Sequence, residues 1–458
     1  MKKVNSVQKK QKPDRFEYMT QTPVPSLILR LAVPTMISML VTAIYNTADT
    51  FFVGRIPENA TQATAAVGLV FPLMSFIQAC GFFFGHGSGN YLSRMLGAGK
   101  KQEASEMAST GFALALITGV TVAVLGNIFI HPLVRFLASE DVSAEALEMT
   151  GQYARIILIG APFMMCQFVV NNQLRFQGSA IYAMIGLVSG AVINMFVDPL
   201  LILGFGMGVR GAAIATVFGQ IISFSILLYG STRGENIRLH FKNIRINKHY
   251  VLQIVNGGAP SLLRQGLAAV STMLLNRAAG QFGGDAAIAG MSVTTRVLML
   301  LVSALIGFGQ GFQPVCSFNY GANLKHRVKE GYRFCVKWGT ICLTAIAAAC
   351  FFFAPQIISL FRNDPAVIAV GQVALRCQAC VLPLNGVIVM TNMMLQSVGK
   401  GVKASLLASA RSGLFFIPAI LILPLFFGLT GVEISQTVSD VCAFALSVPL
   451  AVSELKKY

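Results

Sequence analysis

Acidic side chains inside long apolar stretches are the residues of this sequence best suited to chemistry. Of the 18 aspartates and glutamates, only Asp49, Asp198, Glu433 and Asp440 fall in such stretches. A charged side chain at the centre of a bilayer costs roughly 2.5–3.5 kcal/mol on insertion scales, and such residues mark ion pathways and proton relays. For Asp440, a structural ion pair is as good an interpretation as a role in an ion pathway or proton relay. Glu433, expected in the first turn of its helix, suits the helix dipole, so we interpret it as structural.

Asp198 has neighbours that create an oxygen-rich site. Asn194 lies four residues earlier and therefore on the same face of a helix. Pro199 follows directly and has no N–H, so the carbonyl of Met195 loses its helical partner. A carboxylate, an amide and a free carbonyl within one turn favour binding of a hard cation or a proton.

Other reactive residue types show no arrangement typical of an enzyme. The nine cysteines lie in apolar runs, and Cys377 and Cys380 form a CxxC with no second pair, so packing explains them better. The five histidines lack metal-binding spacing, and no glycine-rich loop is followed by Lys-Ser or Lys-Thr. The sequence therefore predicts no enzyme activity, no cofactor and no direct use of ATP.

The composition places these residues in a membrane. Hydrophobic residues make up 55% of the chain and charged residues only 12%, whereas about 25% of a soluble domain is charged. This deficit excludes an ordinary soluble enzyme and a disordered chain. The net charge of +17 could suggest nucleic acid, but the placement of the basic residues, described below, indicates no nucleic-acid partner.

Apolar runs long enough to span a bilayer, about 17–25 residues each, follow one another along the chain. Helices explain them better than strands, because the strands of a membrane barrel would be shorter and alternating. Twelve runs are expected, at about 26–53, 64–90, 108–131, 151–176, 180–204, 211–230, 250–280, 286–314, 332–354, 366–397, 402–427 and 431–453.

Lysines and arginines are concentrated in every second loop. The N-terminal segment, the 94–101 loop and the 231–248 segment are rich in them, whereas the intervening loops carry single arginines such as Arg135 and Arg210. Basic loops remain in the cytoplasm. Both termini are therefore predicted to be cytoplasmic, in agreement with an even number of spans.

The two halves of the chain repeat the same features in the same order. One repeat holds six helices, and an even number preserves orientation, so the sequence predicts parallel repeats: two six-helix bundles around a central cleft, which is a transporter plan. The expected parts are an N-terminal segment (1–25), an N-lobe (26–230), a linker (231–248) and a C-lobe (249–458). Matching positions include Pro34 with Pro260, Gly85-His86-Gly87 with Gly309-Gln310-Gly311, Pro162 with Pro383, and Asn171 with Asn392.

Three segments resemble the multidrug and toxic compound extrusion (MATE) family of cation-coupled antiporters. They are Tyr45 to Gly54 (YNTADTFFVG), Asn194 to Leu200 (NMFVDPL) and Leu174 to Gly178 (LRFQG). The resemblance covers about residues 20–455. For the DinF-like and MepA-like branch it implies a cation site in the N-lobe, for H⁺ or Na⁺, formed by Asp49, Asn194, Asp198 and Thr216.

The C-lobe departs from the NorM-like branch of this family. That branch has acidic residues in the seventh and tenth helices, where this chain has Arg264, Gln265 and Arg376 instead. Arg264, Arg296 and Arg376 lie deep in their spans and need partners, and Asp440 is the expected partner for one of them, whereas Arg411 is expected to snorkel to an interface. Candidate residues lining the substrate cleft are Tyr45, Asn46, Arg264, Gln265, Arg296 and Arg376.

The resemblance implies a secondary active multidrug exporter. Such a protein would exchange amphipathic, mostly cationic organic compounds for H⁺ or Na⁺ by alternating access. A lipid or lipid-linked precursor flippase of related fold is the alternative. We expect a monomer that spans the plasma membrane of a prokaryote many times and binds small organic molecules.

Overall fold

Helices form almost all of this computed structural model, which describes residues 14–56, 60–138 and 143–458, except for the side chains of residues 45–51 and 60. The N-terminal half contains α1 (Arg15–Gln21), α2 (Val24–Val53), α3 (Ala60–Gly97), α4 (Lys101–Ile128), α5 (Ile130–Leu137), α6 (Ala144–Phe176), α7 (Ala180–Pro199), the π-helix η1 (Leu200–Gly204) and α8 (Gly208–Ser231). The C-terminal half contains η2 (Phe241–Asn243), α9 (Lys248–Gly321), α10 (Lys325–Phe352), α11 (Ala354–Phe361), α12 (Pro365–Val381), α13 (Leu384–Ser397), α14 (Gly401–Ser409), η3 (Ala410–Leu414), α15 (Phe416–Phe427) and α16 (Leu429–Leu455).

Ten helices in the described part of the chain are long and apolar enough to cross a membrane. The bent pair α12 and α13, at 59° to each other, forms an eleventh span. The 74 residues of α9 would extend about 110 Å as one straight helix, several times the hydrocarbon thickness of about 30 Å. Gly284 has a non-helical backbone (φ 64°, ψ −158°) and divides α9 into two spans. These divisions account for the twelve predicted spans.

Short helices that do not cross the membrane were missing from the sequence prediction. They are α1, α5 and α11, of seven or eight residues each. Their length is below that of a span, so hydropathy over a long window does not detect them. One boundary was also wrong: α16 begins at Leu429, so Glu433 lies beyond the first turn and is buried.

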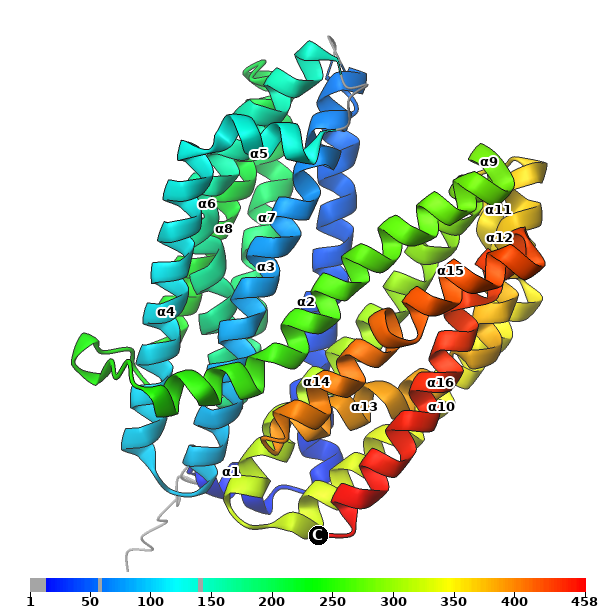
Figure 1. Ribbon diagram of the computed structural model, residues 1–458. Coiled ribbons are helices and arrows are strands. Elements are labelled where there is room, and N and C mark those ends of the chain that lie inside the picture. Colours follow the sequence, from blue (N-terminus) through cyan, green and yellow to red (C-terminus); the bar gives the residue numbers. More distant parts are fainter. Residues whose placement is uncertain (1–13, 57–59, 139–142) are drawn as a thin grey trace, which may run out of the picture.

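Each half of the chain packs around its own apolar core. Ile77, Ile157 and Met165 belong to a buried cluster formed entirely by the first half, and Phe416 and Val432 belong to one formed by the second. We call these units the N-terminal bundle (α2–α8) and the C-terminal bundle (α9–α16). Figure 1 shows the two bundles side by side, in contact at one end and diverging toward the other.

The internal repeat is visible in matching hydrogen bonds. The amide of Asn171 donates to the carbonyl of Ala183 (2.9 Å) in the N-terminal bundle. The amide of Asn392 donates to the carbonyl of Ala404 (2.6 Å) in the C-terminal bundle. Both bonds link residues twelve apart across the junction between two helices. The two bundles are therefore built on the same local plan, as the repeated sequence features predict.

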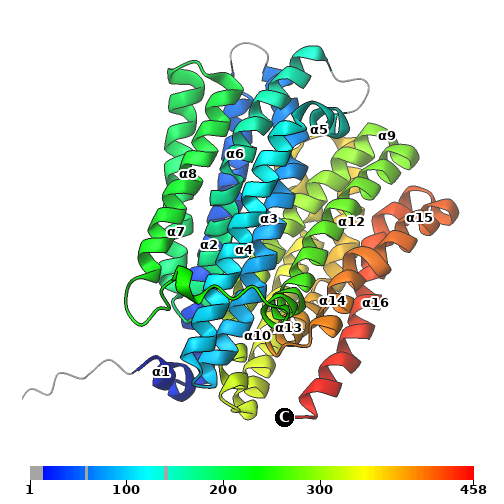
Figure 2. The same ribbon diagram turned by 60° about the vertical axis from the view of Figure 1, so that its left-hand side comes forward.

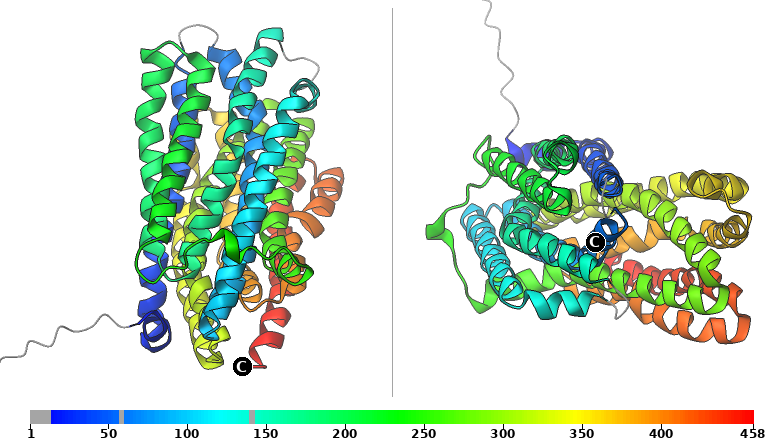
Figure 3. Two further views of the ribbon diagram at one scale, coloured as in Figure 1. Left: turned by 90° about the vertical axis from the view of Figure 1, so that its left-hand side faces the viewer. Right: turned by 90° about the horizontal axis from the view of Figure 1, so that it is seen from above.

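The bundles meet at the end that holds α1 and the C-terminus, which we call the joined end. The segment between α8 and α9 crosses from one bundle to the other near this end (Figures 2 and 3). Met19 and Leu27, from α1 and α2, share a buried cluster with Phe312 and Tyr332 of the C-terminal bundle. The start of the first spanning helix therefore packs against the opposite bundle.

Glycines allow the helices of the two bundles to touch at the joined end. A Cβ at Gly87 of α3 would overlap the carbonyl oxygen of Ile254 in α9, and one at Gly311 of α9 would overlap the backbone of Ala32 in α2. Backbone contact of this kind requires residues without a side chain. These contacts hold the two bundles together at the joined end.

Candidate functional site

Asp198 lies near the end of α7 and is completely buried. Asn194, one turn earlier, is 2% exposed and lies beside it. With the Asn194 amide oriented so that its oxygen accepts from the backbone N–H of Thr216 (3.2 Å), its nitrogen donates to Asp198 Oδ2 (3.2 Å). The structure thus brings together three of the four predicted coupling residues from two helices.

Thr216 supplies an unused oxygen to this group of residues. It lies in α8 and is 1% exposed, and its Oγ1 has no hydrogen bond partner among the described side chains. A buried hydroxyl without a partner costs roughly 1–3 kcal/mol, so it indicates a site that a further group completes. Carboxylate, amide and hydroxyl oxygens are suitable ligands for a hard cation such as Na⁺ or acceptors for a proton relay.

Pro199 changes the helix immediately after Asp198. The regular helix α7 ends at Pro199, and Leu200–Gly204 continue as a π-helix. The N–H of Phe205 donates to the carbonyl of Leu200 (2.9 Å), which closes one of the wider turns. Single π turns inside helices occur frequently at functional sites. The expectation that Pro199 disturbs the helix beside the carboxylate agrees with this geometry.

The predicted residues of α2 lie outside the described side chains. Asp49, Tyr45 and Asn46 are part of the helix Val24–Val53, but only their backbone is described. The predicted four-residue coupling site, with Asp49 as its second carboxylate, therefore stays a prediction.

A second buried polar group lies between the bundles. Arg175, at the end of α6, is 2% exposed. Its guanidinium donates to Gln310 of α9 across the interface, to Asn172 Oδ1 (2.5 Å) and to His86 Nε2 (3.2 Å). The Nδ1 of His86 contacts the carbonyl of Phe82 (3.1 Å). The sequence assigned no site to this group, although His86 and Gln310 occupy matching positions of the repeat.

Arg264 lies close to this group without bonding to it. Its charge interacts with both Arg175 and His86. In the described part of the chain, its guanidinium has no hydrogen bond and no carboxylate within 4.0 Å. The side chain is neither fully buried nor fully exposed. Of the predicted cleft residues with described side chains, it is the one that lies beside the contact between the bundles.

The other predicted cleft residues of the C-terminal bundle do not join Arg264. Arg376 donates to the carbonyl of Phe351 (3.2 Å) within its own bundle and lies 5.8 Å from the Phe351 ring centre. Arg296 is exposed, and Gln265 is half-buried. The structure thus separates the three arginines that the sequence analysis grouped.

Asp440 has a different partner from the expected one. Its carboxylate accepts from Arg411 Nε (2.8 Å), and also from Gln436 (2.8 Å) and Asn385 (3.1 Å). Arg411 therefore does not snorkel to an interface, and the expectation that Asp440 pairs with Arg264, Arg296 or Arg376 was wrong. The reason is geometric, because η3 and α16 pack together and bring Arg411 against the buried carboxylate.

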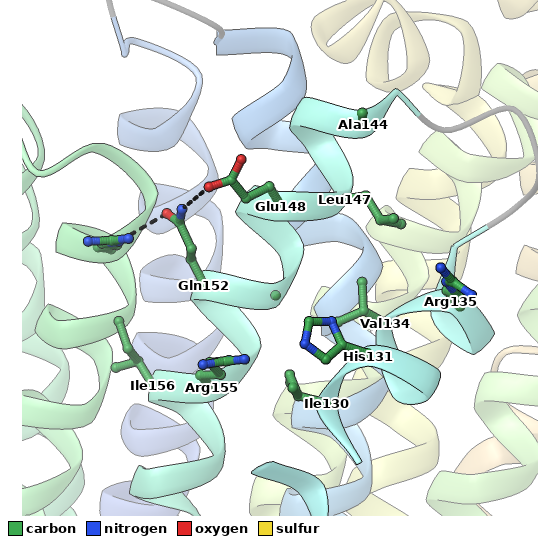
Figure 4. Close-up of a pocket in the computed structure, with 12 residues that line it drawn as sticks. Ile130, His131, Val134, Arg135, Ala144, Leu147, Glu148, Gln152, Arg155 and Ile156 are labelled. Atoms are coloured by element: carbon green, nitrogen blue, oxygen red, sulfur yellow. Dashed lines mark hydrogen bonds between the residues drawn. The ribbon is translucent and has the colours of Figure 1, made fainter. Parts of the chain in front are cut away.

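A pocket opens in the N-terminal bundle at the end away from the joined end (Figure 4). It has a volume of about 670 Å³ and lies between α5, α6 and the start of α8. Gln152, on its wall, accepts from Arg210 (3.0 Å) and donates to Glu148 (3.1 Å). None of the predicted coupling or cleft residues with a described side chain lines it, so its size does not make it the candidate site.

The arrangement defines a class of protein. Two related bundles of membrane-spanning helices, joined at one end and diverging at the other, with a buried carboxylate inside one bundle, form a membrane transporter of the alternating-access type.

The MatE family model matches residues 34–200 and 260–422, which is more than half of the chain and includes both bundles. The chain belongs to the MATE family of membrane transporters. It is a multi-pass membrane protein of that family and not an enzyme.

Curated relatives and solved structures agree with this assignment. The chain is 28% identical over 439 residues to the multidrug export protein MepA of Staphylococcus haemolyticus (strain JCSC1435), covering 94% of each protein. It is 26% identical over 436 residues to MepA of Staphylococcus aureus (strain NCTC 8325 / PS 47), covering 95% of each.

Similar solved structures span nearly the whole chain. One is a MATE protein in complex with MaL6 (TM-score 0.90, 28% identity, 98% of this chain and 100% of that one). Another is the outward-facing conformation of a multidrug resistance MATE family transporter of the MOP superfamily (TM-score 0.89, 27% identity, 98% and 99%). A third, a MOP superfamily transporter from Pyrococcus furiosus Vc1 (DSM3638), is described as having a binding pocket of reverse polarity that suggests a different function (TM-score 0.89, 27% identity, 97% and 99%).

Proposed function

We propose that this protein is a secondary active exporter that exchanges amphipathic organic compounds for H⁺ or Na⁺. The observation that carries the proposal is the buried carboxylate of Asp198, bonded to Asn194 and next to the hydroxyl of Thr216, which has no partner among the described side chains. A carboxylate inside a membrane bundle is costly unless it binds a cation or proton during its cycle. Export of several drugs is inferred from the MepA relatives, whose names state multidrug export.

The mechanism follows from two alternative arrangements of the bundles. With the joined end closed, a cation reaches the N-terminal bundle from the opposite side and neutralises Asp198. Neutralisation favours repacking of α7 and α8, which opens the joined end to cargo. Loss of the cation on that side restores the charge and the first arrangement. Each step requires only that the two arrangements differ in affinity for the cation.

The test is transport by the purified full-length protein in proteoliposomes loaded with ethidium, a cationic dye. We expect ethidium to move in the direction opposite to the flow of Na⁺ or H⁺ down an imposed gradient. This movement should stop when an ionophore removes that gradient. Movement of ethidium that ignores both gradients would contradict antiport. Translocation of a fluorescent phospholipid without ethidium transport would identify a lipid flippase instead.

We also propose that the joined end faces the cytoplasm, with a linker over 231–248 between two lobes, 26–230 and 249–458. The exposed segment before η2 carries Arg233 and Arg238, and η2 itself carries Lys242. Basic loops remain on the cytoplasmic side. The loop between α11 and α12, on the opposite side, carries one basic residue, Arg362.

Orientation can be measured with a membrane-impermeant thiol reagent on intact cells, in a variant without the native cysteines. We expect His240→Cys to react only after the cells are permeabilised, and Arg362→Cys to react in intact cells. Both positions are exposed in the structure, so differences in labelling report the side of the membrane. The opposite pattern would reverse the proposed topology.

A further inference from the structure

We propose that the contact between the bundles contains a binding site for an anionic group of the cargo, a carboxylate or phosphate. Arg264, next to Arg175, would bind this group. This inference rests on the proposed function and extends it from cationic to zwitterionic and anionic amphipathic compounds. The site uses residues that are all within the described part of the chain.

The first argument is an excess of positive charge without counter-charge. The described partners of Arg175 are Gln310, Asn172 and His86, all of them without negative charge. Arg264 has no carboxylate within 4.0 Å among the described residues. Two guanidinium groups without a described counter-charge therefore lie at the contact between the bundles. Buried charges are normally paired, because an unpaired one loses its hydration.

The predicted span carboxylates with described side chains, Asp198, Glu433 and Asp440, form no ion pair with Arg175 or Arg264. Asp198 lies in α7 with Asn194, and Asp440 is paired with Arg411. The contacts of His86 fit a neutral ring in which Nδ1 donates to Phe82 and Nε2 accepts from Arg175. No described side chain therefore neutralises the two arginines, and an anion from solution is the natural partner.

The second argument is an unused donor at the same contact. Arg175 Nε is buried and has no hydrogen bond acceptor among the described residues. A pocket of about 10 Å³, which is room for about one water molecule, lies against Arg175 and Gln310 and is also lined by Thr35, Ser38 and Asn171. Arg175 therefore keeps hydrogen-bonding capacity at the contact between the bundles.

The third argument is the position of Arg264 along α9. Gly258 touches α3 closely, since a Cβ there would overlap the carbonyl of Phe83. Arg264 follows six residues later, about 9 Å further along the helix. It therefore lies beyond the Gly258 contact, further along α9 from its start at Lys248 near the joined end. A cargo molecule entering from the opposite end meets Arg264 before Arg175.

Guanidinium chemistry selects the ligand class. The planar donor array of arginine matches the two oxygens of a carboxylate or phosphate. An organic cation gains nothing from Arg264 and is repelled by it. Arg175 already uses both terminal nitrogens, so it acts as a positioning residue that holds Gln310, Asn172 and His86 together. Arg264, which has no hydrogen bond among the described residues, contacts the ligand.

The experiment compares two dyes of opposite charge on the purified full-length protein: fluorescein, an anion, and ethidium, a cation. Binding is followed by fluorescence anisotropy for wild type, Arg264→Gln and Arg264→Lys. The matched control is Arg277→Gln, an exposed arginine on the same half of α9. Thermal unfolding of each variant is measured in parallel.

We expect Arg264→Gln to weaken fluorescein binding by about tenfold or more, as expected for loss of one charged hydrogen-bonding group. Ethidium binding should be unchanged or tighter, Arg264→Lys should restore part of the affinity for fluorescein, and Arg277→Gln should match wild type. Equal fluorescein affinity in all variants would overturn the proposal. Equal loss of both dyes with a lower unfolding temperature would make Arg264 structural and would also overturn it.

Competition identifies the source of the anion. If inorganic phosphate at millimolar concentration does not displace fluorescein, the site recognises an organic cargo, as proposed. Displacement would assign the site to an inorganic ion and overturn its role in cargo binding. Gradient-driven ethidium transport remains the separate readout of the proposed function, so a failure of antiport and a failure of this site give different results.

Discussion

Replacing Asp198 with asparagine is expected to abolish gradient-driven efflux while the protein still folds. The amide keeps the shape of the side chain and its contact with Asn194, but it carries no charge and cannot take up a proton. Asp198 is completely buried, so no water compensates for the change. Without a group that differs in cation affinity between the two arrangements, the cation gradient cannot drive the cycle.

The measurement is ethidium transport in proteoliposomes under an imposed Na⁺ or pH gradient. Asp285→Asn is the matched control, because Asp285 is exposed and lies just after the turn at Gly284. We expect wild-type transport in the control and only downhill, gradient-independent leakage in Asp198→Asn. If Asp198→Asn keeps the wild-type response to both gradients, Asp198 is not the coupling residue.

Replacing Gly87 with alanine is expected to prevent closure of the joined end and to stop transport. A Cβ at this position would lie 2.9 Å from Ile254 Cα and closer still to the carbonyl oxygen of that residue. Backbone atoms cannot rotate away as a flexible side chain can, so α3 and α9 must separate. Because each bundle has its own core, the expected response is separation of the bundles rather than unfolding.

Distances between spin labels at positions 100 and 400, one in each bundle at the joined end, measure this separation. Gly68→Ala is the matched control, since Gly68 lies on the same helix α3 and a Cβ there meets nothing within 4 Å. We expect a longer label distance and loss of gradient-driven transport in Gly87→Ala, and wild-type values in Gly68→Ala. A wild-type distance with normal transport in Gly87→Ala would show that this contact does not control closure.

The spanning helices and their repeat could be predicted because both depend on local sequence. A span requires about 20 apolar residues in a row, whatever its neighbours are. The pairing of Asn194 with Asp198 was also predictable, because residues four apart lie on the same helical face. The break at Gly284 also falls between two predicted spans, 250–280 and 286–314, because a single run of that length would exceed the bilayer.

Contacts between helices distant in the chain could not be predicted in the same way. Asp440 pairs with Arg411 because η3 and α16 pack together, and nothing in the local sequence separates Arg411 from the other membrane arginines. The three arginines that appeared to form one group are divided in the structure between the interface of the bundles, the C-terminal bundle and the exposed surface.

The sequence by itself determined the class of fold, the number of spans and the family resemblance, and it predicts Asp198 as a coupling carboxylate. The tertiary structure decided which charges are paired, which end of the molecule is joined, and that Arg175, His86 and Gln310 converge. The physical reason is the distance along the chain over which each effect acts. Hydropathy and helical periodicity act over neighbouring residues, whereas the cost of a buried charge depends on which distant helix packs against it.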